Sequence, residues 1–201
     1  MGRKESKIQR RTSHSLGIIF FVLVSQNLIS SPIDHHQERF EDVALKIWEY
    51  AELGYLEEKS SSLLQQELKH SGFSIQSGIA GIPTAFIAEY NNGGPVLGIL
   101  GEFDALPGLS QQNLPFKTAE GLNSANGHAC GHHLFGAASA WAAVAIKEWL
   151  EESGTPGTIR FYGTPAEEGG SGKVYIARDG YFDDVDIVLH WLSLIHISEP
   201  T

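Results

Sequence analysis

The spacing of apolar residues in this 201-residue chain changes from a helical pattern to a strand pattern after Gly72. Before that glycine, the helical spacing predicts two amphipathic helices. The first carries Phe40, Val43, Ile47 and Tyr50 and ends at Gly54, and the second covers about 57–70 with Leu63, Leu64 and Leu68 on one side. After Gly72, the runs FSIQSG, TAFIAEY and PVLGILGEF are rich in β-forming residues and are separated by glycine-rich turns.

The second half of the chain alternates between the two patterns. A helix is predicted from about Leu134 to Glu152, with five apolar residues on one flank: Leu134, Ala138, Trp141, Ala145 and Trp149. The strand TIRFYG, a short helix over about 173–178 and the strand DIVLHW follow. Strands that alternate with helices in this way predict an α/β fold, a sheet covered by helices. Catalytic groups in such folds tend to follow the carboxyl ends of strands.

The distribution of charge argues against nucleic acid as a partner. The formal net charge is -10, yet residues 1–15 contain five of the 14 Lys and Arg residues and only one of the 24 Asp and Glu residues. The remainder of the chain is therefore strongly acidic, whereas a phosphate backbone requires a basic face.

Residues 1–30 have the pattern of a secretory signal peptide. The basic stretch GRKESKIQRR precedes the apolar run LGIIFFVLV and the polar stretch SQNLISS. The apolar run is shorter than the ~20 residues that span a bilayer. A membrane anchor and a start codon upstream of the true one are the alternatives. We expect a secreted or periplasmic protein if the signal is genuine and a cytoplasmic one otherwise.

The last ten residues, LSLIHISEPT, do not continue the preceding strand and contain no turn punctuation. They resemble a translated sequencing-library adapter. We therefore expect that residues 192–201 are not native, and that residues 31–191 are the N-terminal part of a longer protein.

The only cysteine, Cys130, lies in the histidine-rich stretch GHACGHHLFG, residues 127–136. A lone cysteine excludes an internal disulfide. The flanking glycines favour an extended segment, in which His128, Cys130 and His132 would share one face and His133 would point away. A thiolate and an imidazole at this spacing suit zinc or a similar metal, although a buried cysteine beside helix-capping histidines fits the residues as well.

Carboxylates and a further histidine follow three of the predicted strands. Glu167 and Glu168 come directly after a strand, where one could bind a metal and the other act as general base toward water, the alternative being a solvated acidic loop. Glu102 and Asp104 follow another strand, and Glu102 fits an ordinary turn equally well. His190 could by itself be a buried core histidine. Together with Cys130 and His132, these positions supply the mixed donor set of a metal hydrolase.

Four motifs carry a resemblance to a known family over about residues 35–191: GEFDALPGLSQ, GHACGHHLFGAASAWAA, GTIRFYGTPAEEGGSGK and FDDVDIVLHW. They resemble the metal-dependent amidohydrolases of the aminoacylase and carboxypeptidase class, and within it aminobenzoyl-glutamate hydrolase-like proteins, relatives of the auxin-conjugate hydrolases. The resemblance implies a zinc-exopeptidase-like catalytic domain, a mixed sheet flanked by helices. Only its N-terminal portion would be present, since the family's lid and dimerisation domain and a late histidine ligand would lie beyond residue 201.

The resemblance also implies roles for individual residues. Four would be metal ligands: Cys130, His132, Glu168 and His190. Glu167 would be the general base, and Asp104 would lie near the metals. Such relatives generally bind two divalent ions, zinc, manganese or cobalt, held ~3.5–4 Å apart. His133 replaces the Asp or Asn of the family, and His128 would lie beside the metals or the substrate without being a ligand.

The implied reaction is hydrolysis of the amide bond of a small N-acyl or N-aroyl amino acid, such as aminobenzoyl-glutamate. The full-length protein would be a homodimer or a hetero-oligomer, and the fragment alone would have little activity. Two rivals remain open. One is a cysteine hydrolase in which Cys130 attacks and a nearby histidine is the base. The other is a non-catalytic metal-binding or ligand-binding protein.

Overall fold

The computed structural model describes residues 34–110, 112, 114, 125–190 and 192. The predicted signal segment, residues 1–30, lies outside them, as do residues 193–201 of the predicted adapter-derived tail. The helices are η1 (Asp34–His36), α1 (Gln37–Tyr50), α2 (Glu58–His70), η2 (Ile79–Gly81), α3 (His132–Ser153), α4 (Glu167–Gly170) and α5 (Gly172–Arg178). The strands are β1 (Ser74–Ser77), β2 (Phe86–Asn91), β3 (Val96–Gly101), β4 (Thr158–Gly163) and β5 (Ile187–Leu189).

The five strands form one mixed sheet in the order β1-β2-β4-β3-β5. β1 and β2 pair in antiparallel fashion, and β2 pairs antiparallel with β4. β3 is parallel to both of its neighbours, β4 and β5. The parallel strands β4, β3 and β5 therefore all end at the same edge of the sheet.

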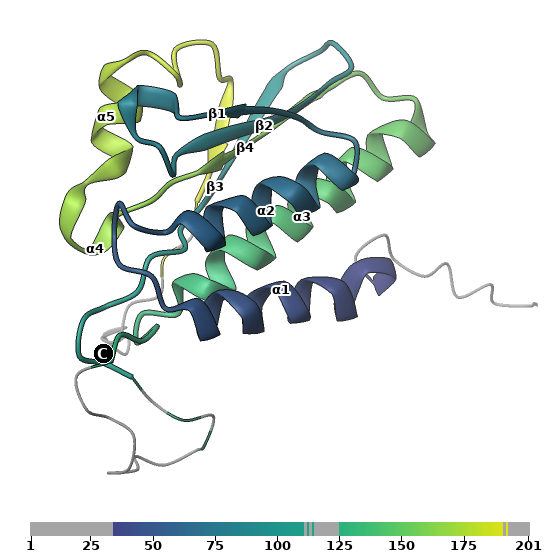
Figure 1. The fold of residues 1–201 in the computed structure, drawn as a ribbon. Helices are drawn as coiled ribbons and strands as arrows, with labels where there is room; N and C mark the ends of the chain where they lie inside the picture. The colour runs from purple at the N-terminus through teal and green to yellow at the C-terminus, as the bar shows by residue number, and fades with distance from the viewer. Residues whose placement is uncertain (1–33, 111, 113, 115–124, 191, 193–201) are drawn as a thin grey trace, which may run out of the picture.

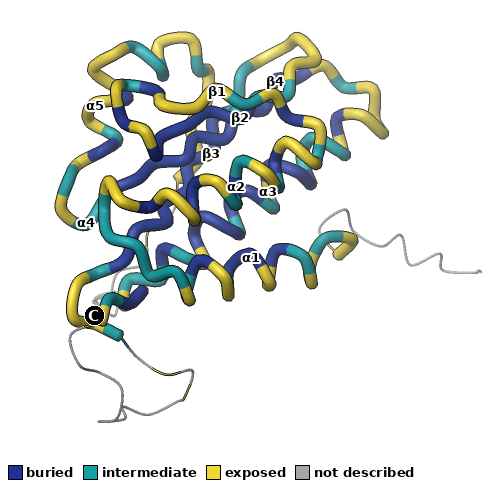
Figure 2. The backbone as a smooth tube through the Cα atoms, viewed as in Figure 1, coloured by how far each residue is buried: buried dark blue, intermediate teal, exposed yellow. Residues whose placement is uncertain are grey.

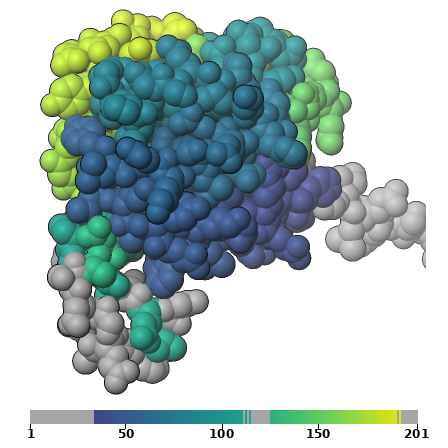
Figure 3. All heavy atoms as spheres, viewed as in Figure 1, coloured from purple at the N-terminus to yellow at the C-terminus, as the bar shows by residue number. Residues whose placement is uncertain are grey.

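Helices cover the two faces of the sheet unequally. α1, α2 and α3 lie together on one side, and α4 and α5 lie on the other (Figure 1). The chain reaches β4 from β3 through α3 on the first face, and reaches β5 from β4 through α4 and α5 on the second face. In the space-filling view, the surface on the first side is formed largely by α1 and α2, coloured purple to blue (Figure 3).

Alternate residues of each central strand contribute to two separate cores, as the two-residue period of a strand requires. Phe86, Ile99 and Phe161 belong to the larger core, which includes the buried faces of α1, α2 and α3. Leu100 and Tyr162, their neighbours in sequence, belong to the smaller core together with Ile176 of α5. The central strands are accordingly buried along most of their length (Figure 2).

The α/β fold class predicted from the sequence, with a mixed sheet flanked by helices, is confirmed. On the predicted flank of the helix after residue 131, Ala145 is buried and Trp141 packs against the larger core, whereas Leu134 and Trp149 are each 52% exposed. The buried side of α3 carries small residues such as Ala137, Ala140 and Val144. Small side chains face inward here because α3 lies close to both the sheet and α1. Among the described residues, no helix has the length and apolar composition needed to cross a membrane.

Close packing at the end of β4 gives a test of this fold. A Cβ atom added to Gly163 would lie 2.1 Å from Cε1 of the fully buried Phe86. We expect Gly163→Ala to destabilise the protein by about 1–3 kcal/mol, the usual result of overpacking a core. Gly169→Ala is the matched control, because nothing lies within 4 Å of the added methyl group. Urea unfolding measures both, and equal stabilities would contradict the packing described.

Candidate metal centre

The carboxyl ends of the parallel strands bring the chemically active side chains together. Glu102 directly follows β3, Glu167 begins α4 shortly after β4, and His190 directly follows β5. α3 begins at the same edge with His132. The crevice at the carboxyl ends of parallel strands is the usual location of sites in open α/β sheets.

His132 is the centre of this group and is 1% exposed. Its Nδ1 lies 2.8 Å from Oδ1 of Asp104, and its Nε2 lies 3.1 Å from Oε2 of Glu102. The same Nε2 is 3.8 Å from a carboxylate oxygen of Glu167 and 3.8 Å from one of Glu168. One imidazole therefore faces four carboxylates.

Asp104 orients His132 and also fixes the start of α4. Its Oδ2 accepts the backbone N–H of Glu168 at 2.9 Å, while Oδ1 contacts the imidazole. Burial alone would raise the pKa of Asp104, but the hydrogen bonds from His132 and from the Glu168 amide outweigh burial and lower it. For His132, burial would lower the pKa, and the contact with Asp104 outweighs it and raises the pKa. Such a carboxylate–histidine contact fixes which imidazole nitrogen is available to a metal.

Glu102 is fully buried, and its two carboxylate oxygens have different partners. Oε1 lies 3.2 Å from Nε2 of His190 and accepts a hydrogen bond from Nζ of Lys173. Oε2 faces His132 at ion-pair distance but has no hydrogen bond of proper geometry, and Oε1 of Glu168 is likewise buried without a partner among the described residues. Buried carboxylate oxygens without partners are costly, and a divalent cation would satisfy them.

The two adjacent glutamates are presented by a strained turn. Ala166, the residue before α4, is fully buried and has φ +56°. This left-handed backbone conformation is energetically unfavourable for any residue other than glycine. Its N–H donates to Oε1 of Glu57 at 2.8 Å, and the hydroxyl of Thr84 donates to Oε2 of the same carboxylate at 3.0 Å. Burial raises the pKa of Glu57. Glu57 therefore stabilises the turn without contacting the site, and its position gives no signal in the sequence.

Cys130 lies beside Glu168, whose carboxylate raises the pKa of the Cys130 thiol to about 11, with burial as the second cause. The segment before α3 is not extended, which corrects the prediction made from its glycines. The N–H of Gly131 donates to the carbonyl of His128 at 3.1 Å, and Gly131 has φ +80°. The turn arises because Gly131, the residue before α3, adopts the left-handed backbone conformation that glycine tolerates without strain.

The turn separates His128 and His133 from Cys130 and His132, although all four lie in the same histidine-rich stretch. His128 is 3% exposed, and its Nε2 lies 3.0 Å from the carbonyl oxygen of Ile47 in α1, which holds it in the helix packing. The ring of His133 lies 5.0 Å from that of His128, and burial lowers the pKa of His133 to about 4. Neither residue belongs to the carboxylate cluster, the group formed by His132 and the four carboxylates of Glu102, Asp104, Glu167 and Glu168.

The structure thus brings all six predicted site residues to one edge of the sheet: Asp104, Cys130, His132, Glu167, Glu168 and His190. It adds Glu102, since ligand atoms of Glu102, His132 and Glu167 lie within 4.8 Å of one another, a spacing that could hold one metal ion. The sequence contained a signal for Glu102, namely a carboxylate two residues before Asp104 at a strand end. That signal does not distinguish a site residue from a turn.

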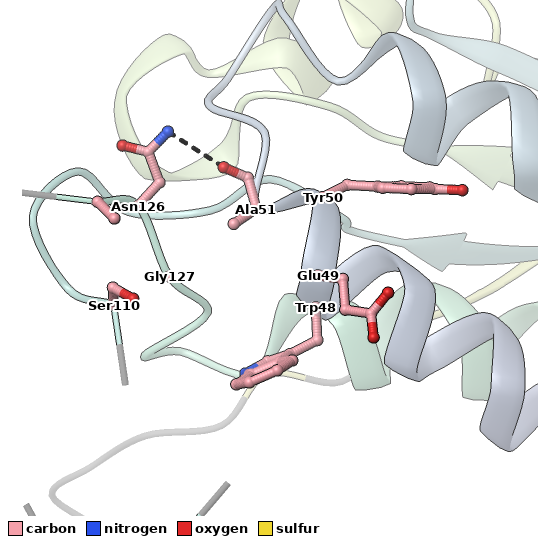
Figure 4. A pocket seen from close by; sticks show the side chains of 8 residues that line it. Trp48, Glu49, Tyr50, Ala51, Ser110, Asn126 and Gly127 are labelled. Carbon is pink, nitrogen blue, oxygen red and sulfur yellow. Dashed lines mark hydrogen bonds between the residues drawn. The ribbon is translucent and has the colours of Figure 1, made fainter. Parts of the chain in front are cut away.

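A separate pocket of about 580 Å³ lies between the end of α1 and the segment that leads into α3. Trp48, Tyr50 and Ala51 form one wall, and Ser110 and Asn126 form another (Figure 4). Nδ2 of Asn126 donates to the carbonyl of Ala51 at 3.1 Å across the two walls. None of the residues that line this pocket belongs to the carboxylate cluster.

A mixed α/β sheet whose strand ends gather imidazole, thiol and carboxylate groups defines a protein of the metallohydrolase class. Residues 98–201 match the peptidase family M20/M25/M40. The chain belongs to this family.

Relatives with stated activities are similar to large parts of this chain. One subunit of the p-aminobenzoyl-glutamate hydrolase of Escherichia coli is 45% identical over 163 residues, which are 81% of this chain and 34% of that protein. The hippurate hydrolase of Campylobacter jejuni is 31% identical over 84% of this chain and 42% of its own length. This chain therefore spans between about a third and two fifths of these relatives.

A solved structure of a metal-binding peptidase supports the same family. A dinuclear metal binding peptidase of the M20 family from Bacillus subtilis is 27% identical, with a TM-score of 0.65 over 77% of this chain and 42% of that chain. The described part of this chain therefore has the same fold as the part of that peptidase that it matches.

The contact between Asp104 and His132 gives a second prediction. We expect Asp104→Ala to weaken binding of Zn²⁺ by about 10–100-fold, because the imidazole loses the partner that orients it. Competition with a chromophoric chelator measures the affinity. Asp42→Ala is the control, since Asp42 is exposed on α1 and pairs with the exposed Lys46. Equal Zn²⁺ affinities for the two variants would contradict the role given to Asp104.

The buried carboxylate behind the Ala166 turn gives a third prediction. Glu57→Ala removes the acceptor of a buried backbone N–H and should destabilise the protein by about 1–3 kcal/mol. Glu57→Gln should cost less, because its amide oxygen can still accept that hydrogen bond. Thermal and urea unfolding give the values, with the exposed neighbour Glu58→Ala as control. If Glu57→Ala and Glu58→Ala were equally stable, the turn would not depend on this carboxylate.

Proposed function

We propose that the protein to which this chain belongs hydrolyses the amide bond of small N-acyl or N-aroyl amino acids in a metal-dependent reaction. One observation carries the proposal: buried carboxylate oxygens of Glu102 and Glu168 without hydrogen-bond partners lie around His132 at the strand ends. The names of the relatives support the substrate class, as they include hydrolases of p-aminobenzoyl-glutamate and of hippurate and a deacetylase of N-acetyl-L-cysteine.

We propose two divalent ions, of zinc, manganese or cobalt, held by the residues that the family resemblance indicates: Cys130, His132, Glu168 and His190. Their thiol, imidazole and carboxylate groups accept several divalent metals. Glu102 faces the same space through Oε2 and is a further donor. When bound, such ions polarise a carbonyl group and make a water molecule more acidic.

Glu167 is the proposed general base. Its carboxylate is 34% exposed, so it can reach both the cluster and a substrate, and an oxygen lies 3.8 Å from Nε2 of His132. Burial and the charge of Glu102 raise its pKa, and a raised pKa makes a carboxylate a better proton acceptor. Glu167 would take the proton of the attacking water on its carboxylate and pass it to the leaving amine nitrogen.

Asp104 has a different role in this proposal. Both of its oxygens are occupied, by His132 and by the Glu168 amide. It would therefore act by holding the imidazole and the start of α4 in place.

We also propose that the full-length protein is a homodimer or a hetero-oligomer. The Escherichia coli relative is by name one subunit of its enzyme, which supports an assembly of subunits.

The contacts of Cys130 favour a metal site over a cysteine nucleophile. The carboxylate of Glu168 beside the thiol raises the pKa of Cys130, and burial and other nearby carboxylates raise it further. An activated cysteine instead has its pKa lowered by a neighbouring positive charge or imidazole. A non-catalytic binding protein is the remaining rival, and it predicts metal binding without hydrolysis.

The test is an assay of p-aminobenzoyl-glutamate hydrolysis. The chain is expressed together with any sequence that follows it in its gene, and is assayed before and after removal of metal by a chelator. We expect activity to be lost with metal and restored by Zn²⁺, Mn²⁺ or Co²⁺. Glu167→Gln should lower kcat by at least about 100-fold, the contribution of a general base.

Two results would contradict the proposal. Full activity after metal removal, together with inactivation by alkylation of Cys130, would favour the cysteine hydrolase. Metal binding with no hydrolysis of any acyl-amino acid in a panel, unchanged by Glu167→Gln, would favour a binding protein.

A further inference from the structure

Lys173 contacts the buried carboxylate at the middle of the cluster. Its Nζ donates a hydrogen bond to Oε1 of Glu102, and no other partner of this ammonium group is found among the described residues. Glu102 is fully buried, while the side chain of Lys173 is 26% exposed. Lys173 belongs to the first turn of α5, so it reaches the cluster from the face of the sheet opposite to α3.

The contact divides the two oxygens of Glu102 between two environments. Oε1 is shared by Lys173 and by Nε2 of His190 at 3.2 Å. Oε2 lies 3.1 Å from Nε2 of His132, and ligand atoms of Glu102, His132 and Glu167 lie close enough to one another to hold an ion. An ion at the cluster can therefore use Oε2 without disturbing Lys173, whereas use of both oxygens requires Lys173 to leave.

Charge gives the contact a second consequence. Four carboxylates meet at this edge, from Glu102, Asp104, Glu167 and Glu168, and within the described part of the chain Lys173 is the one lysine or arginine that contacts any of them. A positive charge next to a cation site repels the incoming ion, and in a partly buried site this repulsion is only weakly screened.

We propose that Lys173 is a built-in counter-ion of the metal centre, which holds Oε1 of Glu102, limits this carboxylate to one oxygen for a divalent ion, and weakens the affinity of the cluster. The inference rests on the metal centre of the proposed function. It makes Lys173 a positioning residue that acts through Glu102. Its role is opposite in sign to that of Asp104, because loss of Lys173 should strengthen metal binding.

The test is Zn²⁺ binding by the 201-residue chain, measured by competition with a chromophoric chelator. Lys173→Met keeps the length and apolar stem of the side chain and removes its charge. We expect about tenfold tighter binding of Zn²⁺, because one repelling charge is lost and Oε1 of Glu102 becomes free for the ion. Lys173→Arg keeps the charge and should bind Zn²⁺ within about threefold of the wild type. Lys46→Met is the matched control, because it removes the same charge from an exposed pair on α1.

A double variant tests whether Lys173 acts through Glu102. Glu102→Gln removes the carboxylate that Lys173 holds, so adding Lys173→Met to it should increase the affinity by less than the tenfold gain expected with Glu102 present. Far-ultraviolet circular dichroism and thermal unfolding show whether each variant is folded.

The possible results separate this inference from the proposed function. Unchanged or weaker Zn²⁺ binding by a folded Lys173→Met variant would overturn the counter-ion role while leaving the metal centre in place. An equal gain in the Glu102→Gln background, or in Lys46→Met, would show a general effect of charge and would also overturn it. A wild-type chain that binds no Zn²⁺ would overturn the metal centre and the inference together.

Discussion

The buried contact between His132 and Asp104 connects three segments that are distant in sequence. Asp104 follows β3, His132 begins α3, and the amide of Glu168, which also donates to Asp104, lies at the start of α4. Burying these charged groups costs several kcal/mol per ion unless each is paired. The pairing therefore requires the three segments to meet in one arrangement, and the other side chains of the cluster are positioned by the same segments.

The surrounding structure supports that arrangement through buried backbone contacts. The left-handed Ala166 directs the two following glutamates toward His132, and its amide is satisfied by Glu57 from the region between α1 and α2. A Cβ atom on Gly54 would approach Ala166 to 3.0 Å, so a small residue is needed where the two segments meet. The segment between α1 and α2 thus shapes the site although none of its side chains belongs to the cluster.

The positions of the site residues could be predicted because they follow strands. A β-rich run identifies a strand in the sequence, and parallel strands end at a common edge, so Asp104, Glu167 and His190 could be expected near one another. Glu102 could not be separated from a turn residue, since both patterns place a carboxylate after a strand. Glu57 and Lys173 give no signal, because their roles depend on contacts with residues about 109 and 71 positions away.

Local pattern was also insufficient where packing partners compete. The glycines around Cys130 suggested an extended segment, yet Gly131 adopts a left-handed turn that begins α3 and moves His128 into contact with α1. On α3 itself, the predicted flank is divided, since Leu134 and Trp149 are exposed whereas Ala145 is buried, and the close approach of α1 and the sheet selects small residues for the buried side.

By itself, the sequence determined the order and type of the elements and the chemical groups at the strand ends, because hydrophobic period and residue type are local properties. Only the tertiary structure decided which atoms of those groups face one another: Oε2 of Glu102 toward His132, Oε1 toward Lys173, and Asp104 behind the imidazole. The physical reason is that burial makes each charge depend on its nearest partner, and the nearest partner is set by how strands and helices pack.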